Sequence, residues 1–117
     1  MPSATPSAKG SALVTGGAGG IGTEIARRLV ADGFRVVITD VDREAGARVR
    51  DELQVEFIPG DSTSEADMRR AMDSAGPVEV LVNNVGIREV AAAVSYMANE
   101  DAVGITGTFL DVSGGFE

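Results

Sequence analysis

The sequence predicts a small α/β domain built on a doubly wound parallel sheet. Short apolar runs rich in Val and Ile alternate along the chain with amphipathic helical patterns, which is typical of repeated βα units. The first apolar run leads directly into a glycine-rich turn, and a helical pattern follows that turn. The chain has 117 residues, a length that indicates one domain with one modest core.

The individual elements follow from the hydrophobic periodicity and from the turn residues between them. The expected strands are residues 11–15, 35–39, 55–58, 78–82 and 108–112. The expected helices are 21–31, 43–53, 65–75 and 88–98, and the second has a thin apolar side of Ala45, Ala47, Val49 and Leu53. Right-handed crossovers would place the loops that follow the strands at one edge of the sheet.

The chain consists of two regions that differ in composition. Residues 1–10 are rich in Pro, Ser and Ala and have no apolar stretch, so we expect a disordered tail rather than a signal peptide. Residues 11–117 continue the βα rhythm without a linker, and we expect them to form a single domain.

The glycine-rich turn over residues 15–22 is the strongest functional signal. It contains Gly16, Gly17, Gly19, Gly20, Ile21 and Gly22. Glycines allow such a loop to turn tightly and to approach a pyrophosphate closely, and the following helix offers free N–H groups and the positive end of its dipole. In the order strand, loop and helix, this pattern predicts a dinucleotide site.

Two spacings fit the same turn. Gly17, Gly19 and Gly22 match G-x-G-x-x-G, whereas the stretch from Thr15 to Gly22 also matches T-G-x-x-x-G-I-G. A nucleoside-triphosphatase loop is excluded because Thr23 follows Gly22 where that motif requires lysine.

An acidic residue stands at the end of the second expected strand. Asp40 lies 18 positions beyond Gly22, and a carboxylate there can accept hydrogen bonds from both adenosine ribose hydroxyls while repelling a 2′-phosphate. This arrangement favours NAD over NADP. The alternative is a solvated acid that caps the turn before Arg43.

Polar residues follow the third and fourth strands as well. Asp61 and Ser62 are candidates for contacts with adenine, and the alternative is that one of them caps the following helix. Asn83, Asn84 and Gly86 close the fourth strand. The asparagines can tie neighbouring loops together or touch the ribose, or they can simply form a turn beside Gly86.

Composition excludes several function classes. The net charge of −8 argues against nucleic acid or an anionic membrane surface as a partner, and no apolar run reaches transmembrane length. The chain has no Cys and no His, so we expect no thiol chemistry, histidine base or metal site. We expect a cytoplasmic protein.

Together these residues resemble the N-terminal half of the short-chain dehydrogenase/reductase family. The resemblance rests on the glycine turn, Asp40, Asp61 and Val80-Leu-Val-Asn-Asn-Val-Gly86, and residues 89–98 and 105–115 resemble that family's last helix and strand. It implies a Rossmann-type fold that binds NAD. With the last strand beside the fourth, the sheet order would be 3-2-1-4-5.

The middle of the family pattern is missing, however, and with it the catalytic serine and the tyrosine-x-x-x-lysine pair. The only lysine is Lys9 and the only tyrosine is Tyr96, which Glu100 follows four residues later. No position matches the catalytic motif, so we assign no catalytic residue. We expect an NAD-binding domain without turnover. The alternatives are a dimerisation or regulatory partner of a full-length relative, or an active oxidoreductase.

The resemblance also implies an assembly. Family members associate through the last helix and strand, so we expect a homodimer through Arg88–Ala98 and Thr108–Val112.

Overall fold

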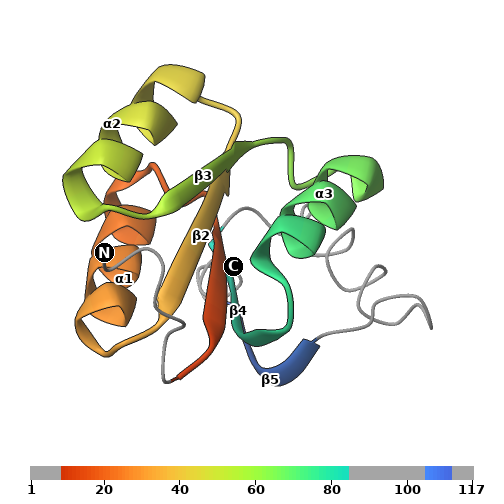
Figure 1. Ribbon diagram of the computed structural model, residues 1–117. Helices are drawn as coiled ribbons and strands as arrows, with labels where there is room; N and C mark the ends of the chain where they lie inside the picture. The colour runs from red at the N-terminus through yellow and green to blue at the C-terminus, as the bar shows by residue number, and fades with distance from the viewer. Residues whose placement is uncertain (1–8, 85–104, 112–117) are drawn as a thin grey trace.

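A computed structural model of the chain describes residues 9–84 and the backbone of residues 105–111 (Figure 1). In chain order, the elements are β1 (Ser11–Thr15), α1 (Gly20–Ala31), β2 (Arg35–Asp40), α2 (Arg43–Leu53), β3 (Glu56–Pro59), α3 (Glu65–Ala75), β4 (Val78–Asn83) and β5 (Ile105–Asp111).

The strands form one sheet in the order β3-β2-β1-β4-β5, and every pairing in it is parallel. This confirms the predicted fold class and strand order. The order reverses direction between β1 and β4, which is the point where ligands bind in open α/β sheets. Thr15 pairs in register with Thr39 on one side and with Asn83 on the other. The carboxyl ends of these three strands therefore lie next to one another.

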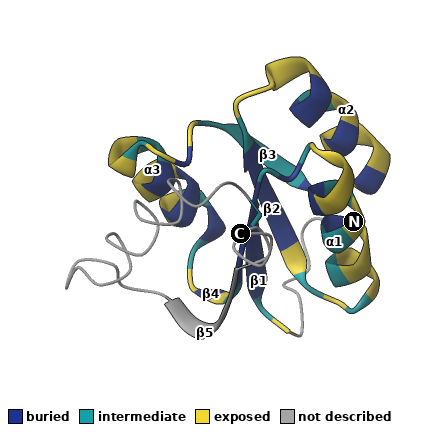
Figure 2. Ribbon diagram, turned by 180° about the vertical axis from the view of Figure 1, so that it is seen from behind, coloured by how far each residue is buried: buried dark blue, intermediate teal, exposed yellow. Residues whose placement is uncertain are grey.

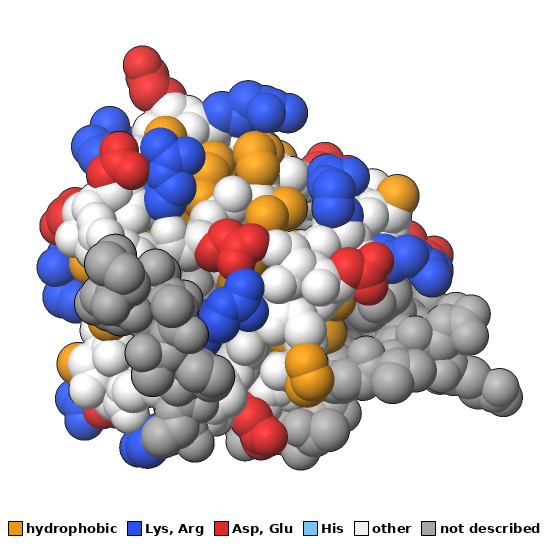
Figure 3. Space-filling model, viewed as in Figure 1, with side chains coloured by type: hydrophobic (Ala, Val, Ile, Leu, Met, Phe, Trp, Pro, Cys, Tyr) orange, Lys and Arg blue, Asp and Glu red, His pale blue; other side chains and the backbone are white. Residues whose placement is uncertain are grey.

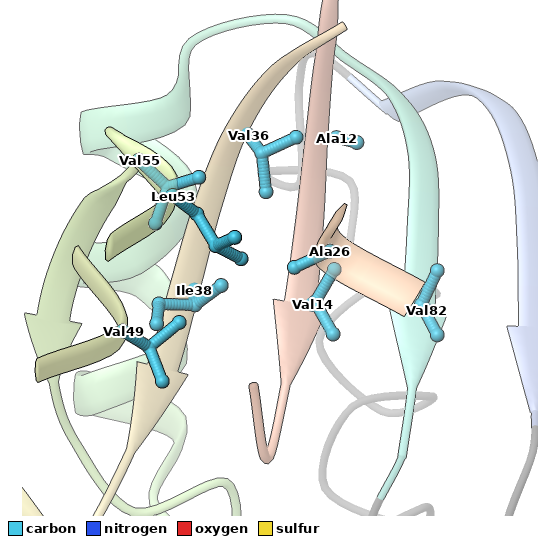
Figure 4. Packing of buried hydrophobic residues seen from close by; sticks show 9 residues of the cluster. All are labelled: Ala12, Val14, Ala26, Val36, Ile38, Val49, Leu53, Val55 and Val82. Carbon is cyan, nitrogen blue, oxygen red and sulfur yellow. The ribbon is translucent and has the colours of Figure 1, made fainter. Parts of the chain in front are cut away.

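Helices cover both faces of the sheet because successive strand side chains point to opposite faces. On one face, side chains of α1 and α2 pack against strand residues such as Val14, Val36 and Ile38 (Figure 4). On the other face, α3 packs through Met68 and Met72 against Leu13 and its neighbours. All five residues of β1 are buried, as expected for the central strand of a two-sided core (Figure 2).

Helix α2 packs on the sheet more closely than the sequence suggested. Gly46 is buried, whereas Ala47, which we expected on the apolar side, is only half-buried. A Cβ atom at Gly46 would overlap the aromatic ring of Phe57. A residue without a side chain therefore lets the helix rest directly on β3.

Two strand boundaries differ from the prediction. β3 occupies Glu56–Pro59 rather than 55–58, because Pro59 pairs with Asp40 at the edge of the sheet, where a missing N–H is tolerated. β5 begins at Ile105, three residues earlier than expected. The expected helix 88–98, Val112 and most of the expected tail lie outside the described residues.

An ionic network fastens α3 at the opposite, amino-terminal edge of the sheet. Arg35 donates hydrogen bonds to Glu56 Oε1 (2.6 Å) and to the backbone oxygen of Ala75 (2.8 Å), and Glu56 also accepts from Ser74. The guanidinium group thereby binds the last carbonyl groups of α3, where a cation is favourable. Across the part of the chain that the structure describes, no helix is long and apolar enough to span a membrane.

Candidate dinucleotide site

The turn between β1 and α1 folds tightly against the carboxyl end of β2. Gly16 adopts a left-handed backbone conformation with φ of 63°, which glycine accommodates without strain. The Gly17 N–H then donates to the Thr39 oxygen at 3.2 Å, and the Gly19 N–H donates back to the Gly16 oxygen at 3.2 Å. These backbone hydrogen bonds fix the loop at Gly17 and Gly19, and side chains bind it at other positions.

The glycines of this turn fall into two groups according to what a side chain would meet. A Cβ atom at Gly17 would lie 2.5 Å from Ile38 Cβ, and one at Gly22 would overlap the Gly16 oxygen. By contrast, a Cβ atom at Gly20 would meet no protein atom within 4 Å, and one at Gly19 would lie 3.6 Å from the Gly16 oxygen. Gly17 and Gly22 are therefore required by the fold itself, whereas Gly19 and Gly20 border open space.

Helix α1 begins without a capping side chain. Its N-cap is Gly19, no side chain accepts a hydrogen bond from its first turn, and that turn holds no acidic residue. The other two described helices are capped, α2 by Asp42 and α3 by Ser64. The first-turn N–H groups of α1 and the positive end of its dipole consequently face the open side of the loop.

Asp40 connects this loop with the start of α2. Its Oδ2 atom accepts from the Ala18 N–H at 3.1 Å, and its Oδ1 atom accepts from the Asp42 N–H at 3.0 Å. The turn-capping interpretation of this residue thus describes part of what it does. Asp40 also lines the cavity described below.

The end of β4 is tied to the start of the glycine turn. Asn84 donates through its side-chain nitrogen to the Gly16 oxygen (3.3 Å) and through its backbone N–H to Thr15 Oγ1 (3.0 Å). Asn83 is completely buried, and its Oδ1 atom lies 3.2 Å from Thr15 Oγ1. Both asparagines therefore link the end of β4 to the β1–α1 turn, and contact with a ribose stays a prediction. Gly86 lies outside the described residues.

Thr15 is one of the residues that our site prediction missed. Its hydroxyl stands between β1 and β4 and is shared by both asparagines. The T-G-x-x-x-G-I-G spacing already contained this threonine, but a hydroxyl at a strand end has no chemical signature of its own.

The turn between β3 and α3 forms the far side of the site. Asp61 Oδ1 accepts from the backbone N–H of Thr63 (2.9 Å) and from its hydroxyl (2.7 Å), and these hydrogen bonds lower the pKa of the Asp61 carboxyl. Asp67 Oδ2 accepts from the Asp61 N–H at 2.8 Å, which with the Arg70 guanidinium lowers the pKa of Asp67. Helix capping belongs to Ser64, while Ser62 is buried beside the cavity.

A cavity of about 250 Å³ lies where these turns meet. Its lining residues are Gly16, Thr39, Asp40, Val41, Gly60, Asp61, Ser62 and Thr63. The structure therefore brings together the predicted residues Gly16, Asp40, Asp61 and Ser62. Val41, which we did not predict, adds an apolar surface and is 68% exposed.

The surroundings of the cavity carry mixed charge. On the face formed by α2, β3 and α3, acidic and basic side chains are interspersed, with hydrophobic side chains between them (Figure 3). Within residues 9–84, no cluster of acidic side chains is suited to holding a metal ion.

Comparison with known proteins agrees with this geometry. The sequence pattern of the family described as short chain dehydrogenase matches residues 10–108. The chain belongs to the short-chain dehydrogenase family. A short-chain dehydrogenase/reductase of Hericium erinaceus is 36% identical over 121 residues, covering 89% of this chain and 48% of the relative. A 3-alpha-(or 20-beta)-hydroxysteroid dehydrogenase of Mycobacterium bovis is 37% identical over 111 residues, covering 86% and 43%.

Solved structures also resemble most of this chain. A 3-ketoacyl-(acyl-carrier-protein) reductase of Brucella melitensis complexed with NADH gives a TM-score of 0.73 at 25% identity, covering 87% of this chain and 55% of the other. The Pseudomonas aeruginosa RhlG/NADP active-site complex gives 0.71 at 27% identity, covering 87% and 52%. The chain thus spans about half the length of its relatives, or less.

The two groups of glycines predict that the same substitution has unequal effects. Gly17→Ala should lower the free energy of unfolding by about 2 kcal/mol, because the new methyl group collides with Ile38. Gly20→Ala should change it by less than about 1 kcal/mol, because its methyl group meets nothing and alanine favours the helix. Urea unfolding followed by circular dichroism measures both. Equal losses in the two variants would contradict the division.

The lowered pKa values of Asp61 and Asp67 predict a loss of stability in acid. Groups with a depressed pKa in the folded state stabilise it above the unfolded value, here 3.8, and this contribution disappears as the pH falls through the lower folded value. We expect the urea concentration at the unfolding midpoint to decrease as the pH is lowered below about 4. Asp67→Asn should make this fall shallower, and Asp73→Asn, on the exposed side of the same helix, should not. Identical pH profiles for the parent protein and Asp67→Asn would contradict the assignment.

Proposed function

We propose that this chain binds a nicotinamide dinucleotide at the carboxyl edge of the sheet, prefers NAD to NADP, and does not turn the cofactor over. One observation carries the proposal. Asp40 and Gly16 line a single cavity, and Gly16 accepts a hydrogen bond from Gly19, the N-cap residue of the uncapped helix α1. A carboxylate for a ribose and a free helix terminus for a pyrophosphate are the two parts that a dinucleotide requires.

The cavity suits the adenosine half of the ligand. Each Asp40 oxygen holds one backbone N–H, and a carboxylate oxygen has a further lone pair with which to accept from a ribose hydroxyl. Asp61 and Ser62 supply polar contacts for adenine on the opposite side, and the exposed Val41 side chain offers an apolar surface for the ring.

The loop and α1 suit the pyrophosphate. Gly19 and Gly20 leave open space at the loop surface, so that a phosphate oxygen can reach the backbone. The N–H groups at Ile21 and Gly22 belong to the first turn of α1, which neither a capping side chain nor an acidic residue occupies. Gly17 supports this arrangement from beneath by its contact with Ile38.

The preference for NAD rests on Asp40. A fixed carboxylate at the adenosine ribose accepts from two hydroxyls and repels a 2′-phosphate. The family as a whole does not decide the matter, since one similar structure contains NADH and another contains NADP.

Asn83, Asn84 and Gly86 complete the proposed site on the β4 side. The proposed role of the two asparagines is to hold the loop against β4, as the contacts of Asn84 with Gly16 and Thr15 do. A direct contact of either asparagine with a ribose remains compatible with this role.

The sequence supports the proposed absence of turnover. Hydride transfer to or from an alcohol or ketone requires a group that moves the proton on the substrate oxygen. The chain contains no histidine, its only lysine is Lys9, and its only tyrosine, Tyr96, has no lysine four residues later. The chain as it stands therefore offers no tyrosine–lysine pair.

Binding should come almost entirely from the adenosine and pyrophosphate half. We expect NAD and ADP-ribose to bind within about threefold of each other, with dissociation constants of about tens of micromolar or weaker, and NADP to bind at least about tenfold more weakly than NAD. Gly20→Val should abolish binding while preserving the fold, because its side chain fills only the open space at the loop. Calorimetric titration measures the affinities of the parent protein for NAD, ADP-ribose and NADP, and the loss of binding in Gly20→Val. Equal affinities for NAD and NADP would overturn the preference for NAD.

The second expectation concerns chemistry. Purified chain incubated with NAD and a panel of secondary alcohols, or with NADH and ketones, should show no change in absorbance above a buffer blank. Turnover that is saturable, survives repurification and disappears in Gly20→Val would show that the chain contains an acid or base that we have not identified.

The proposed homodimer stays a prediction. β5 stands at one end of the strand order in the described sheet, and exposed strand edges favour pairing. Arg88–Ala98, the other half of the predicted interface, lies outside the described residues.

A further inference from the structure

Asp40 makes two hydrogen bonds that have no part in recognising a ribose. Its Oδ2 atom holds the Ala18 N–H at the tip of the glycine turn, and its Oδ1 atom holds the Asp42 N–H at the start of α2. One carboxylate thus joins two segments that are 22 and 2 positions away from it in the sequence.

We infer that Asp40 is a positioning residue for the glycine turn as well as the ribose acceptor, so that selectivity for the cofactor and order of the phosphate-binding loop depend on the same side chain. This inference rests on the proposed dinucleotide binding. It predicts that Asp40 also strengthens the binding of a nucleotide that has no ribose hydroxyls.

The composition of the turn explains why such a connection matters. The stretch from Gly16 to Gly20 contains four glycines, and glycine loses more backbone freedom than any other residue when it is ordered. The Gly17 and Gly19 N–H groups bond to backbone oxygens. The Ala18 N–H, between them, bonds to a charged oxygen instead, and such hydrogen bonds are the stronger kind.

The opposite side of the turn is not fastened in this way. Asn84 donates to Thr15 and Gly16, at the start of the turn, and Thr23 Oγ1 donates to the Gly17 oxygen from within α1. Without Asp40, no described side chain binds the Ala18 N–H. When the Asp40 carboxylate is removed, we therefore expect the tip of the turn to become disordered in the ligand-free protein.

A ligand without ribose hydroxyls separates this role from ribose recognition. The experiment compares ADP with 2′,3′-dideoxy-ADP, titrated into the 15N-labelled parent protein and into Asp40→Ala and followed by chemical shifts. If Asp40 acted only on the hydroxyls, removing its negative charge beside an anionic ligand would leave dideoxy-ADP binding unchanged or strengthen it. If Asp40 orders the turn, its removal should weaken dideoxy-ADP binding about tenfold. The dissociation constant for dideoxy-ADP therefore rises only if Asp40 orders the turn.

Asp42→Ala is the matched control. It removes a carboxylate two residues away and the N-cap of α2, yet it keeps the backbone N–H that Asp40 accepts. Its dissociation constant for dideoxy-ADP should stay within about twofold of the parent value. Amide hydrogen exchange at Ala18 in the free protein should accelerate about tenfold in Asp40→Ala and remain unchanged in Asp42→Ala.

The outcomes are distinguishable. Parent protein that binds neither ADP nor dideoxy-ADP at millimolar concentration would overturn the proposed function itself. Parent protein that binds both, with Asp40→Ala binding dideoxy-ADP equally well or more tightly, would overturn only the positioning role. Asp40→Asn keeps one acceptor oxygen and the side-chain shape, so it should give an intermediate weakening. If Asp40→Ala fails to fold, Asp40→Asn replaces it in the test: weaker binding of dideoxy-ADP supports the positioning role, and unchanged or tighter binding overturns it.

Discussion

The close approach of the β1–α1 turn to the strands on either side of β1 is the constraint on which the site depends. On one side, Gly17 lies so near Ile38 that no side chain fits between them. On the other side, Asn84 and the Thr15 hydroxyl bind the turn to β4. Because β1 itself is fully buried between its neighbours, the turn has a fixed origin, and α1 begins at a fixed place above the sheet edge.

This constraint separates glycines that serve the fold from glycines that leave room for a ligand. In a sequence pattern, all glycines of a phosphate-binding turn are equivalent, but in the structure their surroundings differ. Gly17 and Gly22 are enclosed by protein atoms, whereas Gly20 faces open space. The proposed function therefore depends on a surface that the first group shapes and the second group exposes.

Much of this architecture could be predicted from the sequence because the signals were local. The alternation of apolar runs and helical patterns gave the strands and helices, and α2 was predicted to the residue at Arg43–Leu53. What could not be predicted depended on contacts between distant segments. The burial of Gly46 requires the ring of Phe57, the extension of β3 to Pro59 requires an edge position, and the role of Thr15 requires the end of β4. The hydrogen bond from Ala18 to Asp40 belongs to the same class, since nothing near Ala18 in the sequence announces it.

The central claim is that a dinucleotide binds where the turns after β1, β2 and β3 meet. Its most direct test is a map of backbone amide shifts in the 15N-labelled chain on addition of NAD. The account predicts saturable shifts confined to residues 16–22, 40–41 and 60–63, with the outer face of α2 around Arg48 unchanged. The absence of saturable shifts at millimolar NAD, or shifts concentrated on another surface, would contradict it.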